Sequence, residues 1–206
     1  MAIPSECKMP DLSGLDSPLI SRLIVPILVG EPGLSRKAQL YRRNFIRLLD
    51  KALREYHEAR EAILATIAEE EEIIRRITYM IAFTDHIETC INAVSRLFKL
   101  LYIIKTEKEA PTFPKPLLKL VETKYDSIAN LRNAVEHMDE QIHNGEVTPG
   151  NPIMLTISKN GDYVVVSEDQ MKFEDLAMVL KKMHEVALYV LTNKKVEAAE
   201  LPDEIP

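Results

Sequence analysis

Residues 36–110 read RKAQLYRRNFIRLLDKALREYHEAREAILATIAEEEEIIRRITYMIAFTDHIETCINAVSRLFKLLYIIKTEKEA and contain neither glycine nor proline. Apolar side chains recur here at alternating steps of three and four residues, which is the spacing of one face of an α-helix. The first part of the series is Tyr41, Phe45, Leu48, Ala52, Tyr56, Ala59, Ile63 and Ile67, and the second is Ile77, Met80 or Ile81, Ile87, Ile91, Val94, Phe98 and Leu101. The stretch therefore predicts long amphipathic helices that pack against one another.

A turn must interrupt this stretch, because one helix of about 70 residues would extend about 105 Å and would not fit a compact domain. The glutamate run at residues 69–72 is suited to a solvated turn between two helices. Asp85 followed by Glu88 has instead the spacing of a helix N-cap with its capping box. The sequence leaves both positions open.

The chain after this stretch predicts a third helix. Prolines between Pro111 and Pro116 end the preceding helix, and Pro116 suits the first turn of the next one. Apolar spacing predicts that helix over residues 117–143, and Asn144-Gly145 supplies its stop.

A β-hairpin and a last helix follow. Two apolar runs within residues 153–166 flank Lys159-Asn160-Gly161, and Asn-Gly between such runs is typical of a hairpin turn. Apolar spacing resumes over residues 171–192 and predicts another helix. The fold class expected is therefore all-α: an antiparallel helical bundle of four to five helices with a small β-hairpin before the last helix.

The two ends of the chain differ from its middle. Residues 1–34 hold prolines at 4, 10, 18, 26 and 32, so we expect an extended arm there. Its apolar segment, residues 19–28, should pack on a groove of its own domain or of a second subunit. We expect the helical domain to span residues 35–193 and a charged tail at 194–206 to be frayed.

The bulk composition narrows the function classes. The formal net charge is −6 and the pI is about 5.5, so no global positive field attracts nucleic acid. Cys7 lies in the proline-rich arm and Cys90 on an apolar helical face, which argues against a disulfide framework. Without a secretion signal, and with residues 19–29 too short and interrupted to cross a membrane, we expect a cytoplasmic protein.

Titratable and hydrogen-bonding side chains concentrate in residues 131–143, which read LRNAVEHMDEQIH. At about 100° per residue, Asn133, His137 and Gln141 form a line opposite the apolar side of a helix. Arg132 lies about 140° around the helix from His137, so the two meet only if the long arginine stem wraps around it.

This segment resembles the HEPN superfamily, in which an arginine, a polar residue and a histidine four to six positions beyond the arginine lie on a late helix of an all-α bundle. Arg132-Asn133-Ala134-Val135-Glu136-His137 fits that pattern. The resemblance extends over about residues 36–193 as helical layout only. It implies a homodimer that brings two motifs together as a metal-independent endoribonuclease, often a toxin with an antitoxin partner or a phage-defence protein.

The family chemistry suits these side chains. His137 would move the proton of the ribose 2′-OH or of the leaving oxygen, and Arg132 would offset charge on the phosphate. Asn133 would orient either His137 or the phosphate. The candidate supporting residues are Glu136, Gln141, Asn92 and Arg96, of which the last two belong to a polar line with Asp85, Glu88 and Lys99.

Other interpretations remain open. Many members of this superfamily lack catalysis, so the alternative is an inactive HEPN-like dimeric binding or adaptor module. A weaker alternative is a structural protein whose long helices form a coiled-coil-like arm. The motif could also be an ordinary solvated face in which Arg132 pairs with Glu136, and the acidic neighbours of His137 oppose an approach by RNA.

No metal or cofactor pattern is complete. Glu140 and His143 have the spacing of a bundle di-iron site, but a second copy is absent, and a zinc ion held by them with His137 would lack a fourth ligand. No phosphate-binding loop, paired-cysteine motif or DNA-binding motif appears. We therefore expect no cofactor, no metal, no membrane and no DNA.

Overall fold

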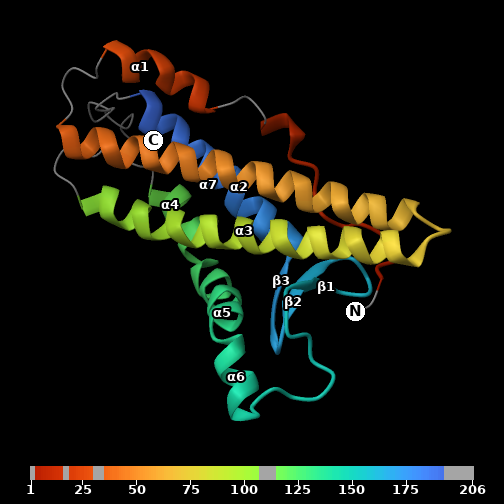
Figure 1. Cartoon of the computed structure of the whole chain (residues 1–206). Helices are drawn as coiled ribbons and strands as arrows, with labels where there is room; N and C mark the ends of the chain where they lie inside the picture. The colour runs from red at the N-terminus through yellow and green to blue at the C-terminus, as the bar shows by residue number, and fades with distance from the viewer. Residues whose placement is uncertain (1–2, 16–18, 30–34, 107–114, 193–206) are drawn as a thin grey trace, which may run out of the picture.

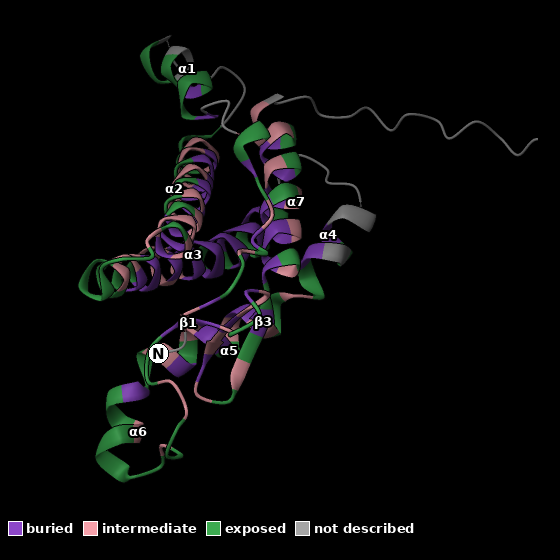
Figure 2. Cartoon of the chain, turned by 90° about the vertical axis from the view of Figure 1, so that its right-hand side faces the viewer, coloured by how far each residue is buried: buried purple, intermediate pink, exposed green. Residues whose placement is uncertain are grey.

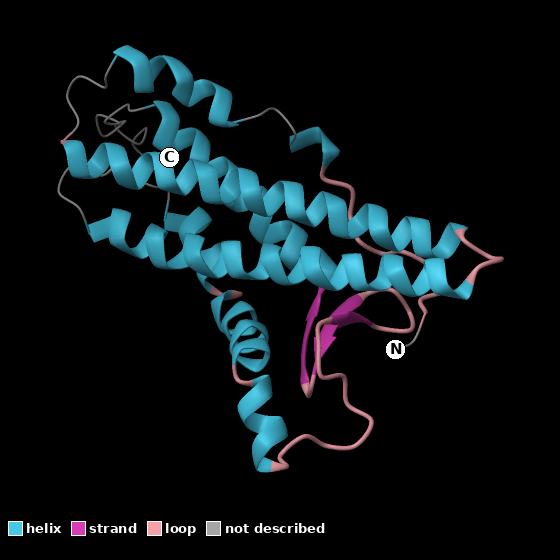
Figure 3. Cartoon of the chain, in the orientation of Figure 1, coloured by secondary structure: helices cyan, strands magenta, loops and turns pink. Residues whose placement is uncertain are grey.

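The computed structural model of this chain describes residues 3–15, 19–29, 35–106 and 115–192. The expected tail at 194–206 and the proline break from residue 111 to 114 lie outside these residues. The fold is mostly helical, with a small antiparallel sheet placed before the last helix (Figure 3). The all-α expectation is therefore confirmed in its main feature.

Two long helices form the body of the molecule. α2 (Arg36–Ala68) and α3 (Ile73–Thr106) run antiparallel along their whole length, and α7 (Phe173–Thr192) packs against them (Figure 1). Most of their apolar side chains are buried, although Ile77 and Ile81 at the N-terminal half of α3 stay about half exposed, and Phe83 of α3 meets Phe173 of α7 edge to face with ring centroids 6.3 Å apart. This helical layer carries most of the hydrophobic core.

The turn between α2 and α3 lies at the glutamate run, between Ala68 and Ile73. The Glu69 carboxylate accepts hydrogen bonds from the backbone N–H groups of Glu71 and Glu72 and pairs with Arg75 at 2.8 Å. These bonds satisfy backbone groups of the turn. The alternative turn at Asp85 is wrong, because α3 continues through it and buries the neighbouring residues Thr84 and Ile87.

The expected hairpin is present, but it belongs to a three-stranded sheet. β1 (Thr156–Ile157) pairs with β2 (Tyr163–Val166) across the Asn-Gly turn, and β2 pairs with β3 (Asp169–Lys172). Apolar spacing predicted that the last helix begins at Met171, but that residue lies in β3 and the helix begins at Phe173. Met171 is buried on the sheet, which explains its apolar character.

The expected third helix is divided into three. α4 (Lys115–Glu122), α5 (Tyr125–Glu136) and α6 (Met138–Asn144) replace the single helix expected over residues 117–143. Neither glycine nor proline lies at these breaks, so the sequence does not signal them locally. They raise the number of α-helices in the described residues above the four to five expected.

α5 and α6 extend away from the long helices beside the sheet (Figure 1). α5 packs against α3 and against the sheet with Ile128 and Leu131 fully buried, and its Tyr125 ring meets Phe98 of α3 edge to face with centroids 5.3 Å apart. α6 buries only Met138, and most of its surface is exposed (Figure 2). Gly145 ends it in the left-handed conformation at φ 70°, as the Asn-Gly stop predicted.

The N-terminal segment packs on the helical body. Before the short helices η1 (Ser13–Leu15), η2 (Leu19–Leu23) and α1 (Ile24–Val29), the chain crosses α2, where Tyr56 donates a hydrogen bond to the Pro10 carbonyl at 3.0 Å. It also meets the hairpin turn, because a Cβ on Gly161 would lie 1.9 Å from the Glu6 carbonyl oxygen. Met9, Leu12, Leu19 and Leu23 are buried in the common core.

Helices long and apolar enough to span a bilayer are absent from the described residues. Cys7 and Cys90 are both free thiols. Burial raises the pKa of the Cys90 thiol well above its ordinary value, so this side chain acts as a core residue.

Candidate functional site

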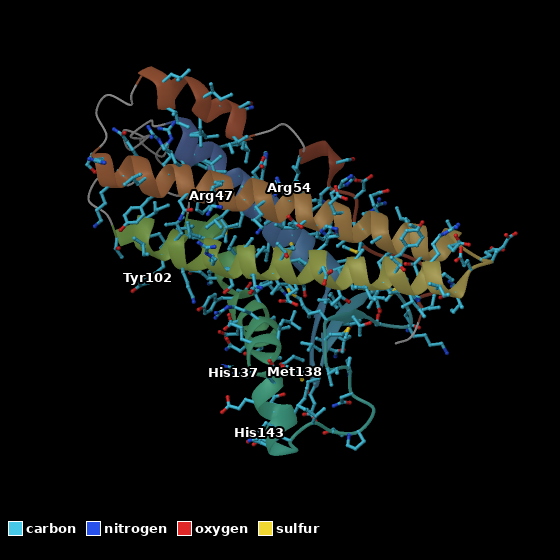
Figure 4. All side chains as sticks on the ribbon, in the orientation of Figure 1. Arg47, Arg54, Tyr102, His137, Met138 and His143 are labelled. Carbon is cyan, nitrogen blue, oxygen red and sulfur yellow. The ribbon has the colours of Figure 1, made fainter. Side chains whose placement is uncertain are left out.

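His137 occupies the junction between α5 and α6 (Figure 4). Its backbone, at φ −100° and ψ 5°, leaves the helical conformation, yet its N–H donates to the Asn133 carbonyl at 2.9 Å. Its own carbonyl accepts from the Gln141 N–H at 3.0 Å. The hydrogen-bond ladder therefore continues through a bend, and the imidazole projects from an exposed corner.

A groove runs beside this junction, and we call it the α5–α6 groove. It is open and has a volume of about 400 Å³. α5, α6, the loop after them and the turn between β2 and β3 line it with Asn130, Asn133, Ala134, His137, Gln141, Glu146, Thr148, Ser167, Glu168 and Asp169. The line of Asn133, His137 and Gln141 expected from the helical spacing thus faces a single cavity despite the bend.

The opposite wall of the groove comes from a tight turn between β2 and β3. Val166 pairs with Asp169 across the turn, and Ser167 adopts a positive φ of 51°. The Ser167 N–H donates to the Pro152 carbonyl at 2.7 Å, which fixes the turn against the preceding loop. Glu168 and Asp169 are thereby held on a well-defined support across from α5.

The groove is acidic. Among the described residues that line it, the charged side chains are the carboxylates Glu146, Glu168 and Asp169, and neither lysine nor arginine is among them. Glu140 adds another carboxylate close by, with Oε2 at 3.5 Å from the His137 Nδ1. Such a surface repels a phosphate backbone and attracts positive charge.

Arg132 does not contribute to the groove. Its Nη2 donates to the Glu136 carboxylate one helical turn on, so the two side chains form a pair along α5. The alternative interpretation, in which Arg132 and Glu136 form an i, i+4 ion pair on a helix surface, is therefore correct for Arg132. Arg132 and His137 are not brought together within this chain.

The other candidate supporting residues separate in the same way. Gln141 lines the α5–α6 groove, whereas Glu136 is occupied by Arg132. Asn92 and Arg96 lie on the solvent side of α3, and no hydrogen bond or ion pair of the described residues joins them to the motif. Their polar line belongs to a different surface.

Sequence reasoning missed half of the groove. Glu146 and Thr148 come from the loop after α6, and Ser167, Glu168 and Asp169 come from the turn between β2 and β3, which lies between the predicted hairpin and the predicted last helix. The available signal was Ser167-Glu168, a polar pair between two strand-like runs, which is suited to a tight turn.

The described residues offer no cluster of three or more histidine, cysteine, aspartate or glutamate side chains arranged to hold a metal ion. His137, Glu140 and His143, the trio weighed for zinc, therefore do not converge on one point. What the groove offers chemically is one exposed imidazole, several side-chain amides and a set of carboxylates.

Comparison of this chain with protein-family models, with curated proteins and with solved structures found no match in any of the three.

Proposed function

We propose that this chain is a HEPN-like helical binding module of the cytoplasm, which holds a positively charged segment of a partner protein in the α5–α6 groove without cleaving RNA. One observation carries the proposal. The groove beside His137 is lined by carboxylates, while Arg132, the cation that a phosphate would need, is paired with Glu136 outside it.

The groove suits a short basic segment. Glu146, Glu168 and Asp169 can pair with lysine or arginine side chains, and the amides of Asn133 and Gln141 can bind backbone groups of an extended peptide. Its open form suits a chain that lies across it better than a small molecule that is enclosed on all sides.

Fluorescence anisotropy at low ionic strength tests this proposal. The probes are a labelled peptide of alternating lysine and serine, its glutamate–serine counterpart and a single-stranded RNA. We expect only the basic peptide to bind, and Glu168→Lys to weaken that binding at least about tenfold.

The matched control is Glu58→Lys, which makes the same charge change at an exposed position of α2 far from the groove. It should leave binding of the basic peptide almost unchanged. Equal binding of the acidic peptide, or equal losses in the two variants, would contradict the proposal.

A second candidate function is metal-independent RNA cleavage in a toxin or phage-defence role. It is supported by one feature, the exposed His137 imidazole beside Asn133 in an accessible groove. Incubation of mixed RNA with the protein in excess chelator, beside His137→Ala, tests it. Cleavage that disappears in the variant would establish it, and RNA left intact by both proteins would exclude it.

A further inference from the structure

The outward side of α3 carries four charged side chains that no residue of the described part of the chain pairs with. Asp85 and Glu88 precede Asn92, and Arg96 and Lys99 follow it. At about 100° per residue all five lie within about 40° of one line along the helix. We call them the α3 charged face. In the described part of the chain none of the four charged side chains forms an ion pair.

Within one chain this arrangement is unfavourable. Asp85 and Glu88 are one helical turn apart with like charge, and so are Arg96 and Lys99, which destabilises a helix mildly. Partial burial raises the pKa of Glu88, and the neighbouring Asp85 raises it further. Among the described residues no ion pair offsets the repulsion within either pair.

The spacing of the face is symmetric about Asn92. Glu88 and Arg96 lie four residues to either side of it, Asp85 and Lys99 seven, and Ile81 and Ile103 eleven. Two such faces laid antiparallel, with Asn92 opposite Asn92, would set each acid against a base and each isoleucine against another.

We propose that α3 is the contact between two copies of this chain, packed antiparallel about a two-fold axis at Asn92. Glu88 then pairs with Arg96 of the second copy, and Asp85 with its Lys99. Two-fold symmetry makes every pair twice, as an isologous interface requires. The proposal does not depend on what the α5–α6 groove binds.

The ends of the face fit the same register. An apolar groove of about 560 Å³ lies at the C-terminal end of α3, lined by residues that include Lys99, Tyr102, Ile103 and Tyr125. Tyr102 is 70 % exposed there (Figure 4), and Ile81 is 50 % exposed at the other end of the face. In the antiparallel register Ile81 of the second copy enters this groove. The exposed isoleucine and the apolar groove then cover each other.

The symmetry also positions the two α5–α6 arms. Phe98, which holds Tyr125 of α5, lies about a third of a turn around α3 from Asn92. A two-fold axis perpendicular to α3 therefore leaves both arms on the same side of the helix pair. The two copies of His137 then lie on one side of the dimer.

Charge reversal tests the contact. Asp85→Lys with Glu88→Arg makes the α3 charged face wholly basic, and Arg96→Glu with Lys99→Glu makes it wholly acidic. Analytical ultracentrifugation over a concentration series should show a native dimer, with the dissociation constant of each variant raised at least about 100-fold. An equimolar mixture of the two variants should restore the dimer.

The possible results separate clearly. A native protein that stays monomeric, variants that remain dimers, or a mixture that stays monomeric would each overturn the proposal. Far-ultraviolet circular dichroism checks that each variant keeps its helices, as expected because Asp85, Arg96 and Lys99 are exposed.

Disulfide trapping fixes the register independently. In a Cys7→Ser background, Asn92→Cys should form a disulfide-linked dimer under mild oxidation, because facing residues on packed helices come within disulfide range. Thr78→Cys is the matched control on the same exposed side of α3, and its two copies would lie far apart. Equal crosslinking of the two variants would contradict the register.

Discussion

The α3 charged face and the line of Asn133, His137 and Gln141 have the same pattern in the sequence, yet they become different surfaces. The α3 line runs along an unbroken helix and stays an open face, with opposite charges at its two ends. The other line bends at His137 and faces a loop and a strand turn that bring three carboxylates.

The role of a polar helical line therefore depends on the residues that lie across from it. For α5 and α6 the opposite wall belongs to the same chain, so the result is a groove with a definite charge. For α3 the described residues provide no opposite wall, and the symmetric charges point to a second copy of this chain. Periodicity locates both lines but cannot tell them apart.

The largest expected effect concerns what lies behind the α3 charged face. Phe83 is fully buried against Phe173, and Phe83→Ala should lower the free energy of unfolding by about 3–5 kcal/mol through the cavity it leaves. Urea denaturation measures this loss. Ile74→Ala, at a side chain that is 69 % exposed on the same helix, should change stability by less than about 0.5 kcal/mol. Similar losses in both variants would mean that α3 does not turn Phe83 toward the core and Ile74 toward solvent.

A smaller effect is expected where the α5–α6 line ends. Gly145 has φ 70°, so Gly145→Ala should cost about 1–2 kcal/mol of backbone strain, although a Cβ there would meet no atom within 4 Å. Thermal or urea unfolding measures the change. Gly14→Ala serves as the control, because that position also has free space but no positive φ. If the two substitutions proved equally harmless, α6 would not end in the left-handed conformation.

The Arg132–Glu136 pair should contribute still less. Arg132→Ala should lower the free energy of unfolding by less than about 1 kcal/mol, since both side chains of the pair are partly exposed to solvent. A double-mutant cycle with Glu136→Ala should give a coupling of about 0.3–0.5 kcal/mol. A coupling near zero would show that Arg132 is free to act elsewhere, which would favour the ribonuclease candidate.

The smallest effect is a pH dependence on the α3 charged face. The pKa of Glu88 lies above its ordinary value of 4.5, so its contribution to stability is complete below that value and is lost as the pH rises through the shifted pKa. Glu88→Gln should remove this loss in the monomer. Carboxyl NMR of Glu88 checks the direction, and dilution of the dimer should raise its pKa as the opposing arginine leaves. A pKa that is indifferent to dilution would speak against the pairing with Arg96.

Much of the fold follows from the sequence. The absence of glycine and proline over residues 36–110 defines α2 and α3, and the glutamate run marks their turn because a solvated tip tolerates four like charges. The Asn-Gly pair at 160–161 sets the hairpin register. These features depend on local backbone preferences, which a single sequence expresses directly.

The remaining features depend on tertiary packing. β3 was missed because Met171 fits a helical series as well as a strand, and only its pairing with Val164 decides between them. The bend at His137 has no local marker either. The carboxylates that line the α5–α6 groove could therefore not be predicted from the sequence. The shared face of Asn133, His137 and Gln141, in contrast, followed from helical spacing alone.

Chemical-shift mapping by NMR tests directly whether the α5–α6 groove is a binding surface to which Arg132 does not belong. On titration with the lysine–serine peptide, the imidazole of His137 and the side-chain amides of Asn133 and Gln141 should shift together, while the Arg132 guanidinium should stay unchanged. A titration in which RNA shifts Arg132 and His137 together, and the basic peptide shifts neither, would show that the groove does not bind a basic segment.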